Sequence, residues 1–224
     1  MAKTAISFKV PPPLWEAFKT QTEELFLSRA PFLDYMVRRE VAHLREELSE
    51  LKLSGRAKRH ISGAMKRMGP VSVNIDVAPA TADALREVVV DHNLVRDAFM
   101  SRLIIFLRST DALLKHLELP CKATSLPGGA SLEEMPASPM RAMEAVRDDP
   151  MCYVRSHVEE IWGCGIYRVA LPRAMDWAAC YLPDDEVTGT AAYRRQSKEI
   201  AAMVSLLDGK PAPKRATKSA RGAK

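Results

Sequence analysis

The chain has 224 residues, of which 47% are hydrophobic and 27% charged, with four cysteines and a formal net charge of +5. This composition is that of a globular protein with a buried core, and it excludes an intrinsically disordered chain or a framework of closely spaced disulfides. No apolar run approaches the ~20 residues that a bilayer crossing needs, and the N-terminus lacks the apolar core of a secretory signal, so we expect a cytoplasmic protein.

The positive charge is concentrated in two segments. Residues 52–69 carry six lysines and arginines and no acid, and residues 210–224 carry six more, again without an acid. Subtracting these twelve bases from +5 leaves the rest of the chain at −7. This distribution favours a polyanionic partner such as nucleic acid, although basic segments that only increase solubility would have the same composition.

The N-terminal stretch TAISFKV, residues 4–10, alternates strictly between apolar and polar positions. Ile6, Phe8 and Val10 fall on one face, which predicts a half-buried β-strand. Three prolines end this strand and open a helix that we expect to run to about Leu27. Ser28 is the expected N-cap of a second helix, whose apolar stripe continues to about residue 51.

The same pattern returns later in the chain. An ungapped shift of 67 positions places Ile6 on Val73, Phe8 on Ile75, Val10 on Val77, Pro12 on Pro79, Phe18 on Leu85, Leu27 on Leu94, Arg29 on Arg96 and Phe32 on Phe99. We therefore predict a second strand at residues 71–77, a helix at 79–92, and a further helix that buries Phe99, Leu103, Phe106 or Leu107, Leu114 and Leu117. We interpret the chain as an internal duplication.

The remaining segments complete the expected organisation. The predicted parts are a first copy (1–53), a basic linker with a short helix near 61–68 (54–69), a second copy (70–119), a loop or tether (120–139), an α-helical region (140–208) and a disordered basic tail (209–224). Within the α-helical region we expect helices at 140–147, 151–162, 172–181 and 191–207.

A strand followed by two amphipathic helices cannot close a core alone, because the strand has no partner and nothing covers the apolar face of each helix. Two copies solve this if their strands pair as an antiparallel ribbon under four helices. Such an arrangement resembles the ribbon-helix-helix family of bacterial DNA-binding proteins, which includes the Arc and Met repressors. The expected fold is mainly α, a tandem ribbon-helix-helix followed by a small helical region. Pairing within one chain and pairing between chains remain open.

The resemblance implies a DNA-binding site. In the family, outward side chains of the ribbon enter the major groove, and backbone amides at the start of each second helix hold a phosphate. The implied base-contacting residues are Ala5, Ser7, Lys9, Ser72, Asn74 and Asp76. The implied phosphate-contacting residues are Ser28, Arg29, Val95 and Arg96, to which the basic linker adds Arg56, Lys58 and Arg59.

These side chains differ in the hydrogen bonds that they can make to base edges. Lys9 can donate to guanine, Asn74 can pair with adenine, and the serines can bond either way. Asp76 suits only the amino group of cytosine and is otherwise costly near phosphates. A second interpretation is therefore a ribbon that has lost direct readout, with the basic segments holding DNA non-specifically.

We expect a sequence-specific, double-stranded DNA-binding regulator, a repressor, in a bacterial cytoplasm and associated with nucleoid or plasmid. The alternatives are an accessory protein of plasmid conjugative transfer or partition, or an antitoxin-like module with a homo-oligomeric or protein partner on the C-terminal helices. We expect no cofactor and no enzyme activity, because the five histidines are scattered. Cys152, His157, Cys164 and Cys180 could be assembled into a metal site only at irregular spacing.

Overall fold

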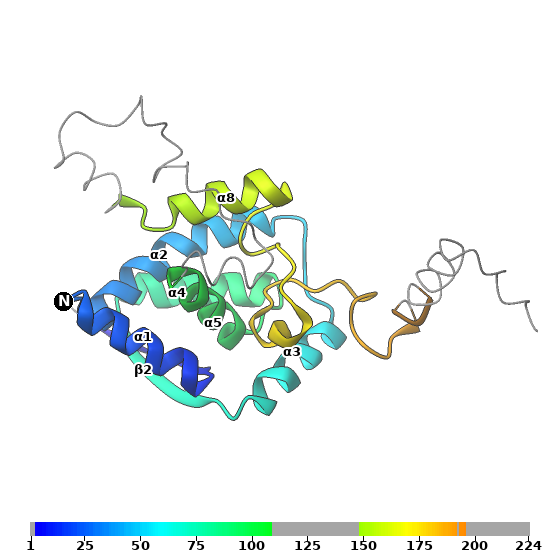
Figure 1. Ribbon diagram of the computed structural model, residues 1–224, viewed down its shortest axis with the longest axis horizontal. Helices are drawn as coiled ribbons and strands as arrows, with labels where there is room; N and C mark the ends of the chain where they lie inside the picture. Colours follow the sequence, from blue (N-terminus) through cyan, green and yellow to red (C-terminus); the bar gives the residue numbers. More distant parts are fainter. Residues whose placement is uncertain (1–2, 109–147, 192, 196–224) are drawn as a thin grey trace, which may run out of the picture. The chain divides into compact units, whose positions relative to one another are not determined.

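The computed structural model describes residues 3–108, 148–191 and 193–195 (Figure 1). It is mainly helical, with one two-stranded sheet. The elements are β1 (Thr4–Val10), α1 (Pro12–Glu24), α2 (Arg29–Glu47), α3 (Gly55–Arg67), β2 (Val71–Val77), α4 (Pro79–Asp91), α5 (Arg96–Leu107), α8 (Cys152–Trp162) and the 3-10 helix η3 (Arg173–Ala178). All belong to one compact unit, residues 1–182, and residues 183–224 form a second unit. No helix in the described ranges is both long and apolar enough to span a membrane.

The two strands form an antiparallel ribbon within one chain. Thr4 lies opposite Val77, Ser7 opposite Asn74 and Val10 opposite Val71. Both predicted strands are confirmed at their expected bounds. Six inward side chains are at most 7% exposed and form part of the core: Ile6, Phe8, Val10, Val73, Ile75 and Val77. The sequence leaves pairing within one chain and pairing between chains open, and in this structure the strands pair within one chain.

The backbone repeats at the spacing of the sequence shift. β2 and α4 begin and end 67 residues after β1 and α1, and α5 begins 67 residues after α2. The turns that follow α1 and α4 also correspond, because Phe26 (φ 53°) and Asn93 (φ 54°) are the two non-glycine residues with left-handed backbone in the described ranges. Each turn is closed by an equivalent hydrogen bond, from Leu27 N to Thr22 O (2.8 Å) and from Leu94 N to Val89 O (2.9 Å).

The basic segment between the halves is a folded helix rather than the expected linker with a short helix. The hydroxyl of Ser54 caps α3 by accepting from the amide of Ala57 (3.0 Å). Ala57, Ile61, Ala64 and Met65 are buried on one side. Their spacing of three and four is helical, but Gly55 and Gly63 obscure it because each glycine costs a helix ~1 kcal/mol relative to alanine.

The second helix of the first half is shorter than predicted. α2 ends at Glu47, and Leu51 lies in an extended connection beyond it. This connection crosses the α4–α5 turn: Leu53 N donates to His92 O (3.0 Å), and Asn93 Nδ2 donates to Leu53 O (2.8 Å). His92 Nδ1 lies 2.8 Å from Leu51 O. Residues 51–54 therefore cover the turn of the opposite half.

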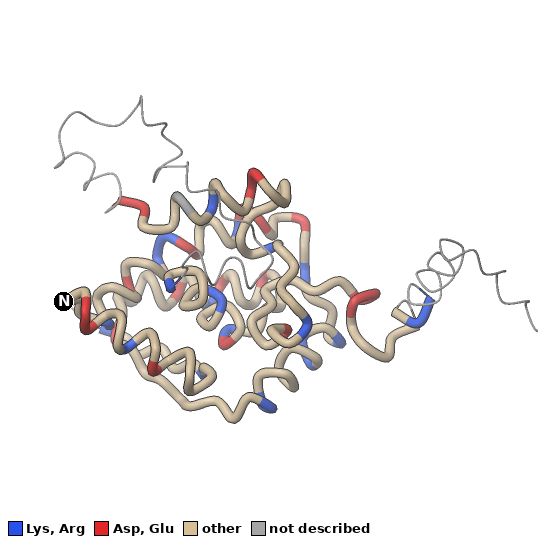
Figure 2. The backbone as a smooth tube through the Cα atoms, in the orientation of Figure 1, with Lys and Arg blue, Asp and Glu red and all other residues tan. Residues whose placement is uncertain are grey.

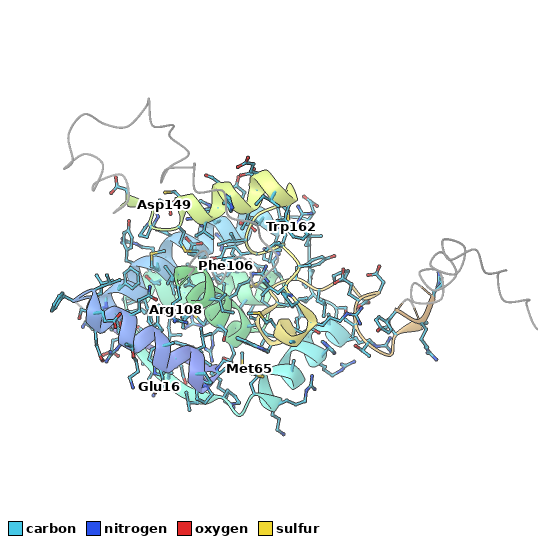
Figure 3. All side chains as sticks on the ribbon, in the orientation of Figure 1. Glu16, Met65, Phe106, Arg108, Asp149 and Trp162 are labelled. Atoms are coloured by element: carbon cyan, nitrogen blue, oxygen red, sulfur yellow. The ribbon has the colours of Figure 1, made fainter. Side chains whose placement is uncertain are left out.

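The C-terminal residues up to 182 pack on the same core. α8 lies beside α2 (Figure 1), and the Arg155 guanidinium binds the fully buried Glu40 carboxylate in a bidentate pair, with distances from 2.7 to 3.0 Å. The hydroxyl of Tyr167 donates to the same carboxylate (2.6 Å). Arg155 also reaches Asp149, which precedes α8 (Figure 3; 2.6 Å). These contacts satisfy charges that would otherwise be costly to bury.

A second buried cation lies in α5. Arg102 is 1% exposed and donates to the backbone carbonyls of Ile166, Val169 and Ala178, while its guanidinium lies 5.7 Å from the Phe106 ring centroid. Burial lowers the pKa of Arg102. Burial also raises the pKa of Glu47. The hydrogen bond that its carboxylate accepts from the Tyr167 amide (2.7 Å) lowers the pKa, but by less than burial raises it.

The structure tests the expected C-terminal helices in part. The helix at 151–162 is confirmed as α8, whereas only a short 3-10 helix, η3, forms within 172–181. Gly163 ends α8 in a left-handed conformation (φ 61°), as expected of a glycine break. The expected positions of Leu114 and Leu117, the tether at 120–139, the helix at 140–147, most of 191–207 and the tail at 209–224 lie outside the described residues.

Candidate nucleic-acid interface

The outer face of the ribbon carries all six residues that the resemblance implies for base contacts. Ala5, Ser7, Lys9, Ser72, Asn74 and Asp76 are each exposed. The register pairs Ala5 with Asp76, Ser7 with Asn74 and Lys9 with Ser72 across the two strands. The structure therefore brings these six side chains together on one surface, as the alternation predicts.

Charge on this face is polarised along the ribbon. Lys9 lies beside Ser72 at one end, and Asp76 lies beside Ala5 at the other. Asp76 stands four positions after Ser72 in β2, which corresponds to ~14 Å of extended chain. Ser7 and Asn74 form the neutral centre of this face, and each side chain can both donate and accept hydrogen bonds.

The start of α2 forms one flank of the ribbon. A surface hollow of about 600 Å³ is lined there by Leu27, Ser28, Arg29 and Ala30 together with Trp15, Glu23, Asn74 and Ile75. Ser28 occupies the N-cap position, but its side chain makes no capping hydrogen bond. Arg29 is bound to Glu23 (2.7 Å), so its charge is largely compensated.

The start of α5 forms the other flank. Its hollow, of about 360 Å³, includes Leu94, Val95, Arg96 and Asp97, which are the positions 67 residues after Leu27, Ser28, Arg29 and Ala30. It also includes Lys58 from α3 and Arg86 from α4, beside Thr4 and Ala5 of β1. Asp97 accepts from the backbone amide of Lys9 (3.1 Å) and thereby joins α5 to the ribbon.

The two flanks differ in charge although their backbones correspond. Glu23 beside Arg29 has an apolar counterpart, Val90, 67 residues later. In the part of the chain that the structure describes, Arg96 forms no ion pair, and Lys58 donates to the neutral Asn93 side chain (2.9 Å). Arg86 in the α5 hollow is paired with Asp83 (2.6 Å), so this flank has Lys58 and Arg96 against the one acid Asp97, and it is still the more cationic of the two.

α3 adds an exposed basic face next to the α5 flank. Arg56, Arg59, Lys66 and Arg67 are exposed, and no acid occurs between Glu50 and Asp76 (Figure 2). At 100° per residue the four bases fall within roughly a 100° arc opposite the buried side of the helix, a helical spacing typical of one face. We call these four residues the α3 basic face.

Sequence reasoning finds part of this face. Arg56, Lys58 and Arg59 are implied as phosphate contacts, and the structure separates them: Arg56 and Arg59 are exposed, whereas Lys58 is half-buried and reaches Asn93. The sequence-based site omits Lys66 and Arg67, because a linker with a short helix gives these residues no common face. Their spacing of seven and eight residues from Arg59 is the signal that places them on its face.

The cysteines and histidines in the described part of the chain do not gather into a metal site. Across the described ranges no group of three or more His, Cys, Asp or Glu residues could hold a metal ion. Cys180 is buried, and burial raises the pKa of its thiol to about 12, so the reactive thiolate is scarce at neutral pH.

The ribbon thus exposes hydrogen-bond donors and acceptors on its outer face, and its flanks expose the starts of two helices together with cations. Comparisons with protein-family models, curated proteins and solved structures found no match to this chain.

Proposed function

We propose that this chain is a tandem ribbon-helix-helix protein that binds double-stranded DNA sequence-specifically and acts as a transcriptional repressor by occupying an operator. The observation that carries the proposal is the ribbon itself, whose six outward side chains are all exposed, whereas six side chains of the opposite face are buried: Ile6, Phe8, Val10, Val73, Ile75 and Val77. The major groove of B-DNA admits a two-stranded ribbon of this kind.

The identities of the outward residues support direct readout. Lys9 donates to guanine O6 or N7, Asn74 pairs with adenine, and Asp76 accepts from the amino group of cytosine. Because β1 and β2 belong to one chain and differ in sequence, the two halves of the ribbon meet different bases. The operator is accordingly non-palindromic.

The flanks support positioning on the phosphate backbone. Free amides and the positive dipole end at the starts of α2 and α5 attract phosphate, and Arg96 and Lys58 add charge on the α5 side. The α3 basic face extends this cationic surface beyond one flank. Binding to phosphates is thus stronger on the α5 side, which fixes the orientation of the protein on its site.

The experiment that tests the proposal is hydroxyl-radical footprinting of the full chain on the DNA upstream of its own coding sequence, with random-sequence DNA as competitor. The expected result is one protected region that survives excess competitor and extends further on one side. Protection without a discrete site, and binding that disappears as salt rises, would favour non-specific binding by the basic segments.

A further inference from the structure

The hollow beside the start of α5, the α5 hollow, has an apolar wall that the proposed phosphate contacts do not use. Its volume is about 360 Å³, and its wall includes Val89, Val90, Leu94 and Val95, together with the buried Leu85. A phosphate contact needs amides and cations but no cavity. A small-molecule site has a mainly apolar lining, a few polar groups and a volume of about 300–1,000 Å³. The α5 hollow has the lining and the size of such a site.

The apolar wall runs from solvent into the core. Val90, at the end of α4, is 67% exposed, Val89 is half-buried and Leu94 is only 2% exposed. A ligand whose apolar body covers this wall removes apolar surface of both partners from water, which favours binding. The wall therefore provides a binding energy that an inorganic anion cannot use.

The equivalent hollow of the first half differs at two positions that decide what it can hold. Trp15 and Glu23 line that hollow, and Ala82 and Val90 line the α5 hollow 67 residues later. A methyl group thus replaces an indole, and an apolar side chain replaces the carboxylate that binds Arg29. The α5 hollow lacks both the aromatic side chain and the acid of its counterpart.

The charge of the α5 hollow favours an anion. Lys58 and Arg96 line it with one acid, Asp97, whose carboxylate already accepts a hydrogen bond from a backbone amide of β1 (3.1 Å). Arg86, the third cation of the lining, is paired with Asp83 (2.6 Å). The N-cap residue of α5 makes no side-chain capping bond, so the first amides of this helix are available to an anion as well.

We propose that the α5 hollow binds a small carboxylate with a compact apolar body. The carboxylate lies at the start of α5 beside Arg96, with Lys58 as a further cation, and the apolar body lies against Val89 and Val90. The same amides and Arg96 hold a DNA phosphate in the proposed function, so the ligand and the phosphate exclude one another. The ligand thereby weakens DNA binding, a consequence that rests on the proposed function, whereas ligand binding itself does not.

Titration of the full chain with benzoate, without DNA, tests the site. Methyl resonances in nuclear magnetic resonance spectra report the contact, with benzamide as a neutral probe of the same shape and inorganic phosphate as an anion without an apolar body. Benzoate should shift the methyl resonances of Val90 and Leu94 and bind about tenfold more tightly than either control, because only benzoate uses both the cations and the wall. Equal affinity for benzoate and either control, or shifts confined to other methyl groups, would overturn the proposal.

The first half supplies the matched variant. Val90→Glu should weaken benzoate binding about tenfold, because the new carboxylate neutralises Arg96 as Glu23 neutralises its own arginine, whereas Val90→Ile should keep the binding. Leu25→Glu is the control, since it places the same charge on an exposed leucine that lines a separate apolar groove beside the α1–α2 turn. Loss of binding in Leu25→Glu but not in Val90→Glu would put benzoate in that groove and refute the proposal.

The effect on DNA is measured separately, at constant ionic strength. Benzoate should lower the affinity of the unchanged protein for its footprinted DNA site, benzamide should not, and Val90→Glu should make the affinity insensitive to benzoate. An equal loss of affinity in both proteins would show that benzoate acts elsewhere and would contradict the proposal. The titration uses no DNA and the footprint uses no benzoate, so failure of this site and failure of the proposed function are distinguishable.

Discussion

At the scale of single residues, the proposed readout depends on side chains that add little to folding. Lys9 and Asn74 are both exposed on the ribbon, and their side chains make no hydrogen bond within the described ranges. Their substitution should therefore change recognition without changing stability, which separates the two roles cleanly.

Lys9→Ala and Asn74→Ala should each weaken discrimination at one base pair by ~1–3 kcal/mol, because each substitution removes a bidentate hydrogen bond to a base edge. The measurement is affinity for a panel of single-base operator variants at fixed salt, with Glu159→Ala on α8 as an exposed control. Unchanged preference at every position in both variants would refute the ribbon as the reading element.

The buried pair of Glu40 and Arg155 should be the most sensitive polar interaction of the core. Glu40→Ala leaves the Tyr167 hydroxyl without its acceptor and leaves Arg155 with Asp149 alone, so we expect a decrease toward the lower end of ~3–5 kcal/mol in the free energy of unfolding. Urea denaturation measures this, and Glu16→Ala, which removes an exposed pair with Lys19, should cost ~1 kcal/mol at most.

Glu47 should give the protein a pH dependence of opposite sign to that of an ordinary surface carboxylate. Burial raises its pKa in the folded state above the usual 4.5, so folding binds a proton. The stabilisation is complete below about pH 4.5 and is lost as pH rises through the raised pKa. Glu47→Gln should remove this decline when unfolding free energy is measured against pH. An identical slope in both proteins would contradict it.

At the scale of elements, we expect α3 to contribute to the affinity for DNA and not to its sequence specificity. Replacing Arg56, Arg59, Lys66 and Arg67 by alanine should weaken binding uniformly across DNA sequences. The magnitude of the salt slope should fall by up to ~3.6, at ~0.9 for each phosphate that the protein no longer neutralises. Arg168→Ala, an exposed cation after α8, is the control. An unaltered slope would exclude α3 from the interface.

Local signals make some elements predictable and others not. Alternation and prolines define β1 and α1 within a few residues, and the 67-residue shift transfers them to β2 and α4. Gly55 and Gly63 obscure the helical pattern of α3 in the sequence, because glycine is a poor helix former. The outward residues of the ribbon follow from its period of two, but the neutralisation of Arg29 by Glu23 and the pairing of Glu40 with Arg155 require contacts across folded chain, the latter 115 residues apart.

At the scale of the whole molecule, the ribbon joins the two halves inside one chain. Folding should therefore be unimolecular, and the melting temperature should not change between low and high protein concentration. Thermal unfolding followed by circular dichroism over a hundredfold concentration range, together with the mass in solution, measures this. A melting temperature that rises with concentration would indicate ribbons formed between chains.

The register of β1 against β2 also has a consequence for how recognition can change over time. In a ribbon made by two identical chains, one mutation alters both strands at once and the two halves of the operator must change together. Here Ser7 faces Asn74 and Lys9 faces Ser72, each encoded separately. Under the proposed function, each strand can acquire a new base preference while the other keeps its own, so the chain can move to a new operator by single steps that each preserve half of the old interface.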